Sequence, residues 1–273
     1  MTQRRYRGLP GWISIITIAT FASLAEVVWA EEPAEVAKAK TGTWKPISIR
    51  FYRWQFGEKN HLGAEQIVQV AENILAAQNK DGGWSKNNDL STLKKPKTSG
   101  KSTFDNLSTY THIMYLVRVR HQTELKRYDE SIRSGIQYTL GTQNRMSGGW
   151  HGADVDAITF NDDVMANIMT FLHEVSTDDG LYDWLDEAMR SKAKTAYNKS
   201  LACILACQVR QGAVLTAWGQ QHDHRTLKPC WARNYEPPCI TACESVGVIR
   251  FLMTIDDPSK EVVQSIQAAT SVP

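Results

Sequence analysis

The sequence ILAAQNKDGGW at residues 74–84 recurs twice further along the chain, and this repeat decides the fold. Residues 140–150 read LGTQNRMSGGW, and ILACQ at residues 204–208 leads to Trp218. The three glutamines stand at positions 78, 143 and 208, so each step of the repeat is 65 residues long. Self-similarity at a fixed period indicates stacked structural repeats.

Each copy of the repeat predicts a pair of helices. Apolar residues recur at helical spacing before each glutamine, and the glycines that follow end the helix because glycine adopts left-handed conformations without strain. We expect second helices at about residues 107–119, 164–173 and 245–253, and a further helix from about Lys260 to Ala269. Because a helical hairpin cannot bury its apolar face alone, the pattern predicts an all-α fold, an (α/α)3 toroid of three stacked hairpins.

The first 30 residues have the features of a secretory signal. Three arginines precede an apolar run at residues 12–24, and Val28-Trp29-Ala30 forms a cleavage site. The run is short for a membrane-spanning helix, so we expect a secreted or periplasmic protein with no stable membrane anchor. The predicted organisation is a signal peptide at 1–30, an N-terminal extension at 31–62 and a toroid domain at 63–273.

The charge balance gives no reason to expect a nucleic-acid partner. The 31 basic and 29 acidic residues become 28 and 28 once residues 1–30 are removed. Basic side chains nevertheless gather at residues 80–101 and 210–233, beside the loops of the repeat. Such runs are often solvated surfaces, but lysines and arginines around carboxylates are also typical of a site for a polyanion bridged by a divalent metal.

Acidic side chains stand where each second helix begins. Asp105, the pair Asp162 and Asp163, and Glu244 each follow a threonine by two to four residues. Helix capping explains one such residue, because a carboxylate accepts hydrogen bonds from the free N–H groups of the first turn. In a ring of repeats, however, equivalent positions converge, so we also expect these acids to line a common groove. The two interpretations do not exclude each other.

Five cysteines, at positions 203, 207, 230, 239 and 243, are too few for a disulfide scaffold. A Cys230–Cys239 disulfide is left open. The first two cysteines lie four residues apart and are expected to pack in a helix as small apolar residues. A metal site made of His222, His224 and Cys230 lacks the usual paired ligand spacing.

With these features the chain resembles the family 10 pectate lyases, which cleave polygalacturonate by β-elimination on an α/α toroid. The resemblance covers about residues 63–260, and its segments occur in the family's order. They are QNKDGGWSKN at 78–87, TFDN at 103–106, ITFNDD at 158–163, LTAW at 215–218 with QHD at 221–223, and ARNYE at 232–236. The resemblance implies a Ca²⁺-dependent lyase acting on de-esterified homogalacturonan, and we expect it to be a monomer.

The resemblance also implies roles for individual residues. Asp105 and Asp162 match acids that bind Ca²⁺ and, through it, the substrate carboxylates, with Asp163 as the alternative to Asp162. Arg233 matches the arginine that abstracts the C5 proton of the sugar. The residues taken to bind substrate lie in the resembling segments and are Lys86, Asn106, Asn161 and Tyr235.

The implied chemistry requires Arg233 to act as a base. Removing a proton next to a carboxylate builds charge on a group that is already anionic, and Ca²⁺ neutralises such charge. A guanidinium, whose pKa lies above about 12, is not a ready base. Only a crowded cationic site next to Ca²⁺ would raise the neutral fraction of Arg233, since like charges disfavour the charged form. The alternative is an ion pair of Arg233 with Glu236 or with substrate, without proton transfer.

Three features depart from the family's pattern. The loop at residues 149–157 is shorter, the run Pro237-Pro238-Cys239 is unusual, and the chain ends at Pro273 where the family continues with a helical segment that supplies another basic residue. Two alternatives stay open: a short form that closes its ring differently, or a truncated product with a weakened core. An incompletely closed ring would expose the apolar face of its last hairpin, with low stability or self-association as the consequence.

Two rival functions remain open. The first is a catalytically impaired pectate-binding toroid that lacks the C-terminal segment. The second is a terpenoid cyclase, which shares the Gln…Gly-Gly-Trp pattern but needs an aspartate-rich motif in an apolar cavity. Asp162-Asp163 is not flanked in that way, and an export signal does not suit isoprenoid chemistry.

Overall fold

The computed structural model describes residues 32–43, 63–88, 90, 100–177 and 180–271. The chain divides into two units, Met1–Glu32 and Pro33–Pro273, and the fold belongs to the second. The predicted signal peptide and most of the predicted N-terminal extension lie outside the described residues. Within the described part of the chain, every helix is too short or too polar to cross a membrane.

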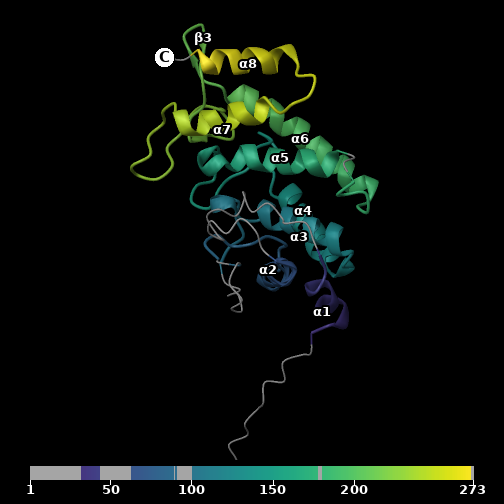
Figure 1. The fold of residues 1–273 in the computed structure, drawn as a ribbon. Coiled ribbons are helices and arrows are strands. Elements are labelled where there is room, and N and C mark those ends of the chain that lie inside the picture. The colour runs from purple at the N-terminus through teal and green to yellow at the C-terminus, as the bar shows by residue number, and fades with distance from the viewer. Residues whose placement is uncertain (1–31, 44–62, 89, 91–99, 178–179, 272–273) are drawn as a thin grey trace, which may run out of the picture. The chain divides into compact units, whose positions relative to one another are not determined.

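The described elements are mainly helices (Figure 1). The α-helices are α1 Ala34–Lys40, α2 Ala64–Ala77, α3 Tyr110–Thr123, α4 Asp129–Gly141, α5 Val164–Ser176, α6 Glu187–Cys207, α7 Ala242–Leu252 and α8 Lys260–Thr270. Single 3-10 turns are η2 Asp105–Leu107, η3 Lys126–Tyr128 and η4 Asn161–Asp163. The predicted all-α fold of stacked hairpins is confirmed.

Four two-residue strands form two small antiparallel sheets. In the first, β1 (Ile158–Thr159) pairs with β4 (Gln221–His222), so that Ile158 faces His222. In the second, β2 (Arg210–Gln211) pairs with β3 (Val214–Leu215) as a hairpin. The first sheet ties the loop before α5 to the long segment between α6 and α7.

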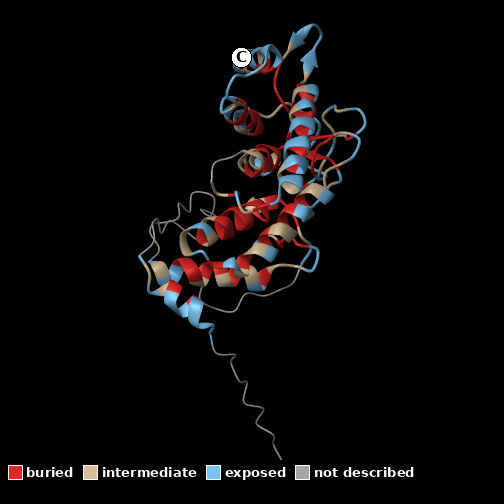
Figure 2. Cartoon of the chain, turned by 90° about the vertical axis from the view of Figure 1, so that its right-hand side faces the viewer, coloured by how far each residue is buried: buried red, intermediate tan, exposed pale blue. Residues whose placement is uncertain are grey.

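The helices pack in two layers. In one layer α3, α5 and α7 lie side by side, and in the other α6 contacts both α4 and α8. The buried residues gather where helices face one another, and the exposed residues lie on the outer surfaces (Figure 2). Helices α3 and α5 carry buried side chains on most of their surface because each is covered by neighbours on several sides. Cys203 and Cys207 belong to this core, as predicted.

Two of the three predicted second helices begin at other residues than expected. Helix α3 starts at Tyr110 instead of about residue 107, because Asn106, Leu107 and Thr109 have positive φ angles of 50°, 61° and 61°. Left-handed residues cannot continue a right-handed helix. Helix α7 starts three residues earlier than expected, directly after Thr241.

The repeated glutamine joins each hairpin to the next. Its side-chain Nε2 donates one hydrogen bond to a carbonyl of the loop that follows and a second to a carbonyl of the next outer helix. Gln78 binds Gly82 (2.8 Å) and Ser131 of α4 (2.8 Å), Gln143 binds Gly148 (2.9 Å) and Ala196 of α6 (2.9 Å), and Gln208 binds Thr216 (2.7 Å) and Ser265 of α8 (2.9 Å). Helix α8 therefore stands in the same relation to α6 as α6 does to α4.

The repeated tryptophan fixes the loop from the inside. Each indole is buried, and its Nε1 donates to a carbonyl of the preceding helix: Trp84 to Ile74 (2.7 Å), Trp150 to Thr139 (2.8 Å) and Trp218 to Ile204 (2.8 Å). Each tryptophan carbonyl then accepts the backbone N–H of a threonine further along the loop: Thr103 (3.0 Å), Thr159 (2.9 Å) and Thr241 (2.9 Å). These three threonines are structurally equivalent, and they place the start of each second helix.

Replacing the repeat glutamine is expected to destabilise the stack. Gln143→Ala removes two hydrogen bonds and leaves the carbonyls of Gly148 and Ala196 without that donor, which should cost about 1–3 kcal/mol of unfolding free energy. Gln137→Ala, at an exposed position of α4, is the control and should be nearly neutral. Urea unfolding followed by circular dichroism measures both, and equal stability of the two variants would contradict the role of the glutamine.

Candidate functional site

The equivalent threonines align the acidic loops residue by residue. Two residues after the threonine stand Asp105 in one loop and Asn161 in the other, and three residues after it stand Asn106 and Asp162. In both loops two successive residues are left-handed: φ is 50° and 61° at Asn106 and Leu107, and 54° and 57° at Asp162 and Asp163. The loops thus share one backbone conformation. Where one loop has a carboxylate the other has an amide, because Asp105 aligns with Asn161 and Asn106 aligns with Asp162. Asn and Asp tolerate this conformation better than most residues.

Helix capping does not account for the acids. The N-cap positions of α3, α5 and α7 are Thr109, Asp163 and Thr241, and none makes a side-chain capping hydrogen bond. The capping interpretation of Asp105, Asp162 and Glu244 is therefore wrong. At these three helix starts no carboxylate accepts a capping hydrogen bond from a backbone N–H group, so the acids can interact with other groups.

The acidic loops meet, as the sequence predicts. The turn η4 contacts both η2 and α7, and a cavity of about 260 Å³ between them is lined by Asn106, Leu107, Asp162, Asp163, Cys243 and Glu244. Burial first, then the negative charges of Asp105 and Glu244, raise the pKa of Asp162 above its ordinary value. Burial and Glu244 raise the pKa of Asp163 in the same way. The charges of these carboxylates thus act on one another across the cavity.

Asp163 differs from Asp162 in what it faces. A side chain at Gly247 of α7 would place its Cβ only 1.8 Å from Oδ1 of Asp163, so that carboxylate packs against the backbone of α7. The Arg250 guanidinium lowers the pKa of Asp163, whereas the cations that act on Asp162 are Arg233 and Lys86. Asp162 therefore shares its cationic neighbours with Asp105, and this geometry favours Asp162 over Asp163 as the second candidate ligand.

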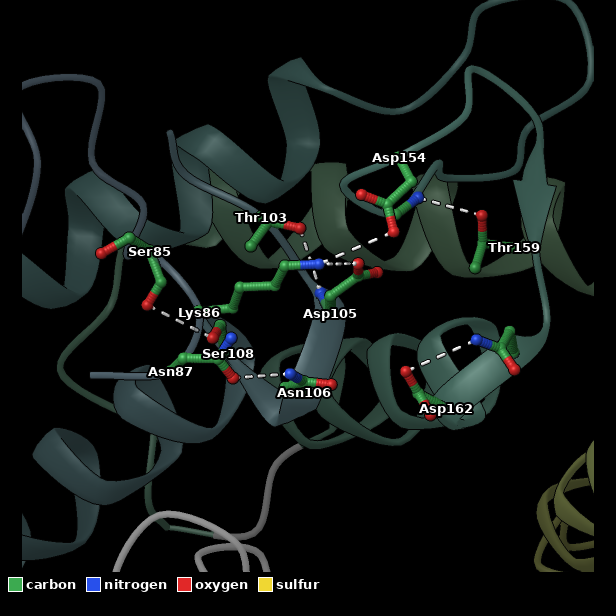
Figure 3. Close-up of polar contacts among 12 residues, drawn as sticks. Ser85, Lys86, Asn87, Thr103, Asp105, Asn106, Ser108, Asp154, Thr159 and Asp162 are labelled. Carbon is green, nitrogen blue, oxygen red and sulfur yellow. Dashed lines mark hydrogen bonds and ion pairs between the residues drawn. The ribbon is translucent and has the colours of Figure 1, made fainter. Parts of the chain in front are cut away.

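Asp105 lies in an adjoining cleft and is bound by a lysine (Figure 3). The Nζ atom of Lys86 is 3.0 Å from Oδ2 of Asp105 and 3.7 Å from Oδ2 of Asp154. On its other side the carboxylate contacts Gly152, because a Cβ at that position would come within 2.2 Å of Oδ1. Asp105 itself is 8% exposed. Only a residue without a side chain leaves room for this carboxylate.

The two asparagines of the site have different partners. Nδ2 of Asn106 donates to Oδ1 of Asn87 at 2.7 Å, and Nδ2 of Asn161 lies 3.5 Å from Oδ2 of Asp162. Asn161 lines the cleft of Asp105, whereas Asn106 lines the cavity of Asp162. Of the predicted substrate-binding residues, Asn106 and Asn161 thus line these hollows, while Lys86 contacts Asp105 and Tyr235 is next to Arg233. Lysines 94, 95 and 97 of the basic run lie outside the described residues.

Arg233 reaches the same cleft as Asp105 but is held by an acid. Its guanidinium forms a two-pronged ion pair with Glu236, in which Nε is 3.0 Å from Oε2 and the second contact joins a terminal nitrogen to Oε1. It also lies 5.0 Å from the ring centre of Tyr235, which is 71% exposed. The hydrogen bond to Glu236 raises the pKa of Arg233, with smaller contributions from the charges of Glu236, Tyr235 and Asp154. The ion pair with Glu236 thus favours the charged form of Arg233, as in the alternative without proton transfer.

Three residues of this cleft were assigned no role from the sequence, although they lie in segments that it marks. Asp154, Gly152 and Gln221 line the cleft with Asp105, and only the pairing of β1 with β4 brings Gln221 there. Trp231, next to the Arg233 segment, is 59% exposed. No repeat or spacing in the sequence gives these residues a role, because they lie in loops of unequal length.

The cysteines and histidines of the 203–243 region do not form the alternative metal site. All five cysteines are unpaired thiols. His222 is buried, with Nδ1 2.8 Å from the carbonyl of Leu227 and Nε2 accepting from the N–H of Gly219 at 3.0 Å. Both ring nitrogens of His222 are thus used within the loop.

The residues present suit a hard divalent cation. Ca²⁺ takes carboxylate and carbonyl oxygens as ligands, and the carboxylates of Asp105 and Glu244 both act electrostatically on that of Asp162. Within the described residues no group of three acidic, histidine or cysteine side chains has the geometry of a complete metal site. The donor set therefore fits a site that is completed by oxygen atoms from solvent or substrate.

The raised pKa of Asp162 predicts how pH affects stability. A folded-state pKa above the unfolded value means that the folded protein binds the proton more tightly, so this carboxylate costs stability as pH rises through its folded pKa. Asp162→Asn should therefore be more stable than the parent protein at neutral pH, and the difference should vanish in acid, below the unfolded pKa. The exposed Asp256→Asn is the control. Thermal unfolding of the parent and both variants across this pH range, without divalent ions, tests the sign of this effect. The prediction is contradicted if Asp162→Asn is no more stable at neutral pH than Asp256→Asn.

Comparison with known proteins identifies the family. The chain matches the family Pectic acid lyase over residues 78–272. Two solved structures resemble it, each with a TM-score of 0.69 and covering 74% of this chain and 65% of the other: a family 10 polysaccharide lyase from Cellvibrio cellulosa at 30% identity, and a mutant family 10 polysaccharide lyase from the same organism in complex with trigalacturonic acid at 29% identity. The chain thus spans slightly less than two thirds of the length of those lyases. No curated protein sequence matches it. With its repeat, its stacked hairpins and its acidic loops, the chain belongs to the pectic acid lyase family, as its resemblance to the family 10 pectate lyases predicts.

Proposed function

We propose that the protein is a Ca²⁺-dependent pectate lyase that cleaves α-1,4-linked polygalacturonate by β-elimination. One observation supports this most directly: Asp105, Asn161 and Arg233, from three distant segments, line one cleft. The adjoining cavity holds Asp162 and Glu244. Membership of the pectic acid lyase family and a similar lyase that binds trigalacturonic acid support the same substrate class.

The substrate is a chain of carboxylates, and the cleft presents cations to it. Lys86 and Arg233 both act electrostatically on the Asp162 carboxylate, so both positive charges lie near the acidic loops. Tyr235 is largely exposed beside Arg233 and offers a ring face to a sugar. Polar groups on the wall, including Asn161 and Thr159, supply hydrogen-bond partners. We assign substrate binding to Lys86, Asn106, Asn161 and Tyr235.

Asp105 and Asp162 are the proposed ligands of the cation. When bound, Ca²⁺ neutralises the charge that develops as the proton next to the substrate carboxylate is removed. In its absence the protein balances part of the acidic charge with Lys86, whose ammonium contacts Asp105 at 3.0 Å.

Arg233 is the proposed base. In the elimination, the C5–H electrons form the C4–C5 double bond, the C4–O4 bond breaks, and O4 gains a proton. Arg233 can accept the C5 proton only as a neutral guanidine, and Glu236 holds it in the charged form. Proton abstraction by Arg233 therefore requires that its ion pair with Glu236 open when substrate enters.

The same ion pair favours a second candidate function. With Arg233 held in its charged form, the cleft suits binding of a uronate carboxylate without turnover. The alternative is therefore a catalytically impaired pectate-binding protein. We also propose that the protein is secreted and acts as a monomer.

A lyase assay separates these functions. Polygalacturonate with Ca²⁺ should yield the unsaturated product, which absorbs in the ultraviolet, and a chelator should abolish the signal. Asp105→Ala and Arg233→Ala should each lower kcat at least about 100-fold while leaving the fold intact. Arg225→Ala, at an exposed position of the same long loop, is the control and should keep full activity. Binding without product would favour the binding protein, and full activity of Arg233→Ala would exclude Arg233 as the base.

The pH dependence of a Glu236→Gln variant tests the base more closely. Glu236 raises the pKa of Arg233, so its removal lowers that pKa. At every pH below the pKa of Arg233 the neutral fraction grows as that pKa falls, so activity that needs neutral Arg233 should be higher at the same pH in Glu236→Gln, and the profile should shift to lower pH. A pH–rate profile of kcat measures the shift. An unmoved profile with altered KM would indicate that Arg233 binds substrate without accepting the proton.

A further inference from the structure

Lys86 lies between two carboxylates that differ in accessibility. Its Nζ is 3.0 Å from Oδ2 of Asp105 and 3.7 Å from Oδ2 of Asp154 (Figure 3). The side chain of Asp105 is 12% exposed, that of Asp154 is 50% exposed, and that of Lys86 is 31% exposed. The lysine thus bridges an inner acid and an outer acid.

The inner acid has little room for a second cation. One oxygen of Asp105 contacts the backbone at Gly152, and the other binds Lys86. The positive charge of Lys86 also acts on Asp162. An ammonium at this place offsets the same negative charges that a divalent cation would offset, and the two cations repel each other.

We propose that Lys86 is a tethered competitor of the divalent cation at Asp105, and that Asp154 is the carboxylate that receives Lys86 when the cation binds. This inference rests on the proposed metal site. The movement needed is small, because Lys86 already lies within 3.7 Å of Asp154 and a lysine has a flexible stem. The released ammonium remains at the cleft, where it faces an anionic sugar.

The proposal predicts effects of opposite sign on Ca²⁺ affinity when Lys86 and Asp154 are replaced. Without Lys86, the cation has no competitor, so Lys86→Met should bind Ca²⁺ more tightly. Without Asp154, the displaced lysine loses its second partner and stays on Asp105, so Asp154→Asn should bind Ca²⁺ more weakly. In the double variant Lys86→Met/Asp154→Asn, Asp154 has no lysine to bind. The loss of Asp154 should therefore not change the Ca²⁺ affinity beyond the effect of Lys86→Met.

The experiment is calorimetric titration of the full chain with CaCl₂ in the absence of sugar. Lys86→Met and Lys86→Gln should each tighten Ca²⁺ binding by roughly fivefold, and Asp154→Asn should weaken it by a similar factor. Two controls carry the same changes of charge at exposed positions: Lys101→Met and Asp156→Asn. Circular dichroism of each variant checks the fold.

The outcomes distinguish this inference from the metal site itself. If the parent protein binds Ca²⁺, Asp105→Ala does not, and Lys86→Met is no tighter than Lys101→Met, the competition is excluded while the metal site stands. If Asp154→Asn weakens binding equally with and without Lys86, Asp154 does not act by receiving the lysine. If neither the parent protein nor Lys86→Met binds Ca²⁺, both proposals fail.

Discussion

The side-chain amide of one glutamine in each repeat bonds a loop to the next outer helix, and the rest of the structure depends on these bonds. Gln78, Gln143 and Gln208 each satisfy one loop carbonyl and one helix carbonyl. Because an unpaired buried carbonyl is costly, the pair of bonds fixes the spacing between successive hairpins. The buried tryptophans then position a threonine in each loop, and the acidic turns follow from there.

In the site, two residues with proposed roles in metal binding and catalysis are each paired with an opposite charge. Asp105 is paired with Lys86, and Arg233 is paired with Glu236. These pairs hold the side chains in place, but they also oppose the chemistry, since a ligand must be free of its lysine and a base must be free of its acid. Function therefore requires exchange of ionic partners, with a substrate carboxylate and a divalent cation as the incoming charges.

Much of the fold and part of the site were predictable from the sequence. The helices, the hairpin repeat and the convergence of Asp162 and Glu244 follow from periodicity, because equivalent positions of a repeat must lie in equivalent places. The predicted start of α3 was wrong, because helix propensity does not reveal the two successive left-handed residues Asn106 and Leu107. The capping interpretation also failed, since whether a carboxylate reaches a backbone N–H depends on the loop conformation and not on its position alone.

The 65-residue period by itself determined that the chain folds as stacked helical hairpins with acids at the entrances of the second helices. Only the tertiary structure decided which charges those acids meet. Lys86 and Asp105 are 19 residues apart, and Asp154 comes from the next repeat, in a loop that differs in length from its equivalents in the other repeats. Periodicity constrains regular elements because their hydrogen bonds are local, whereas ion pairs between irregular loops are set by where the packed helices hold the loop ends.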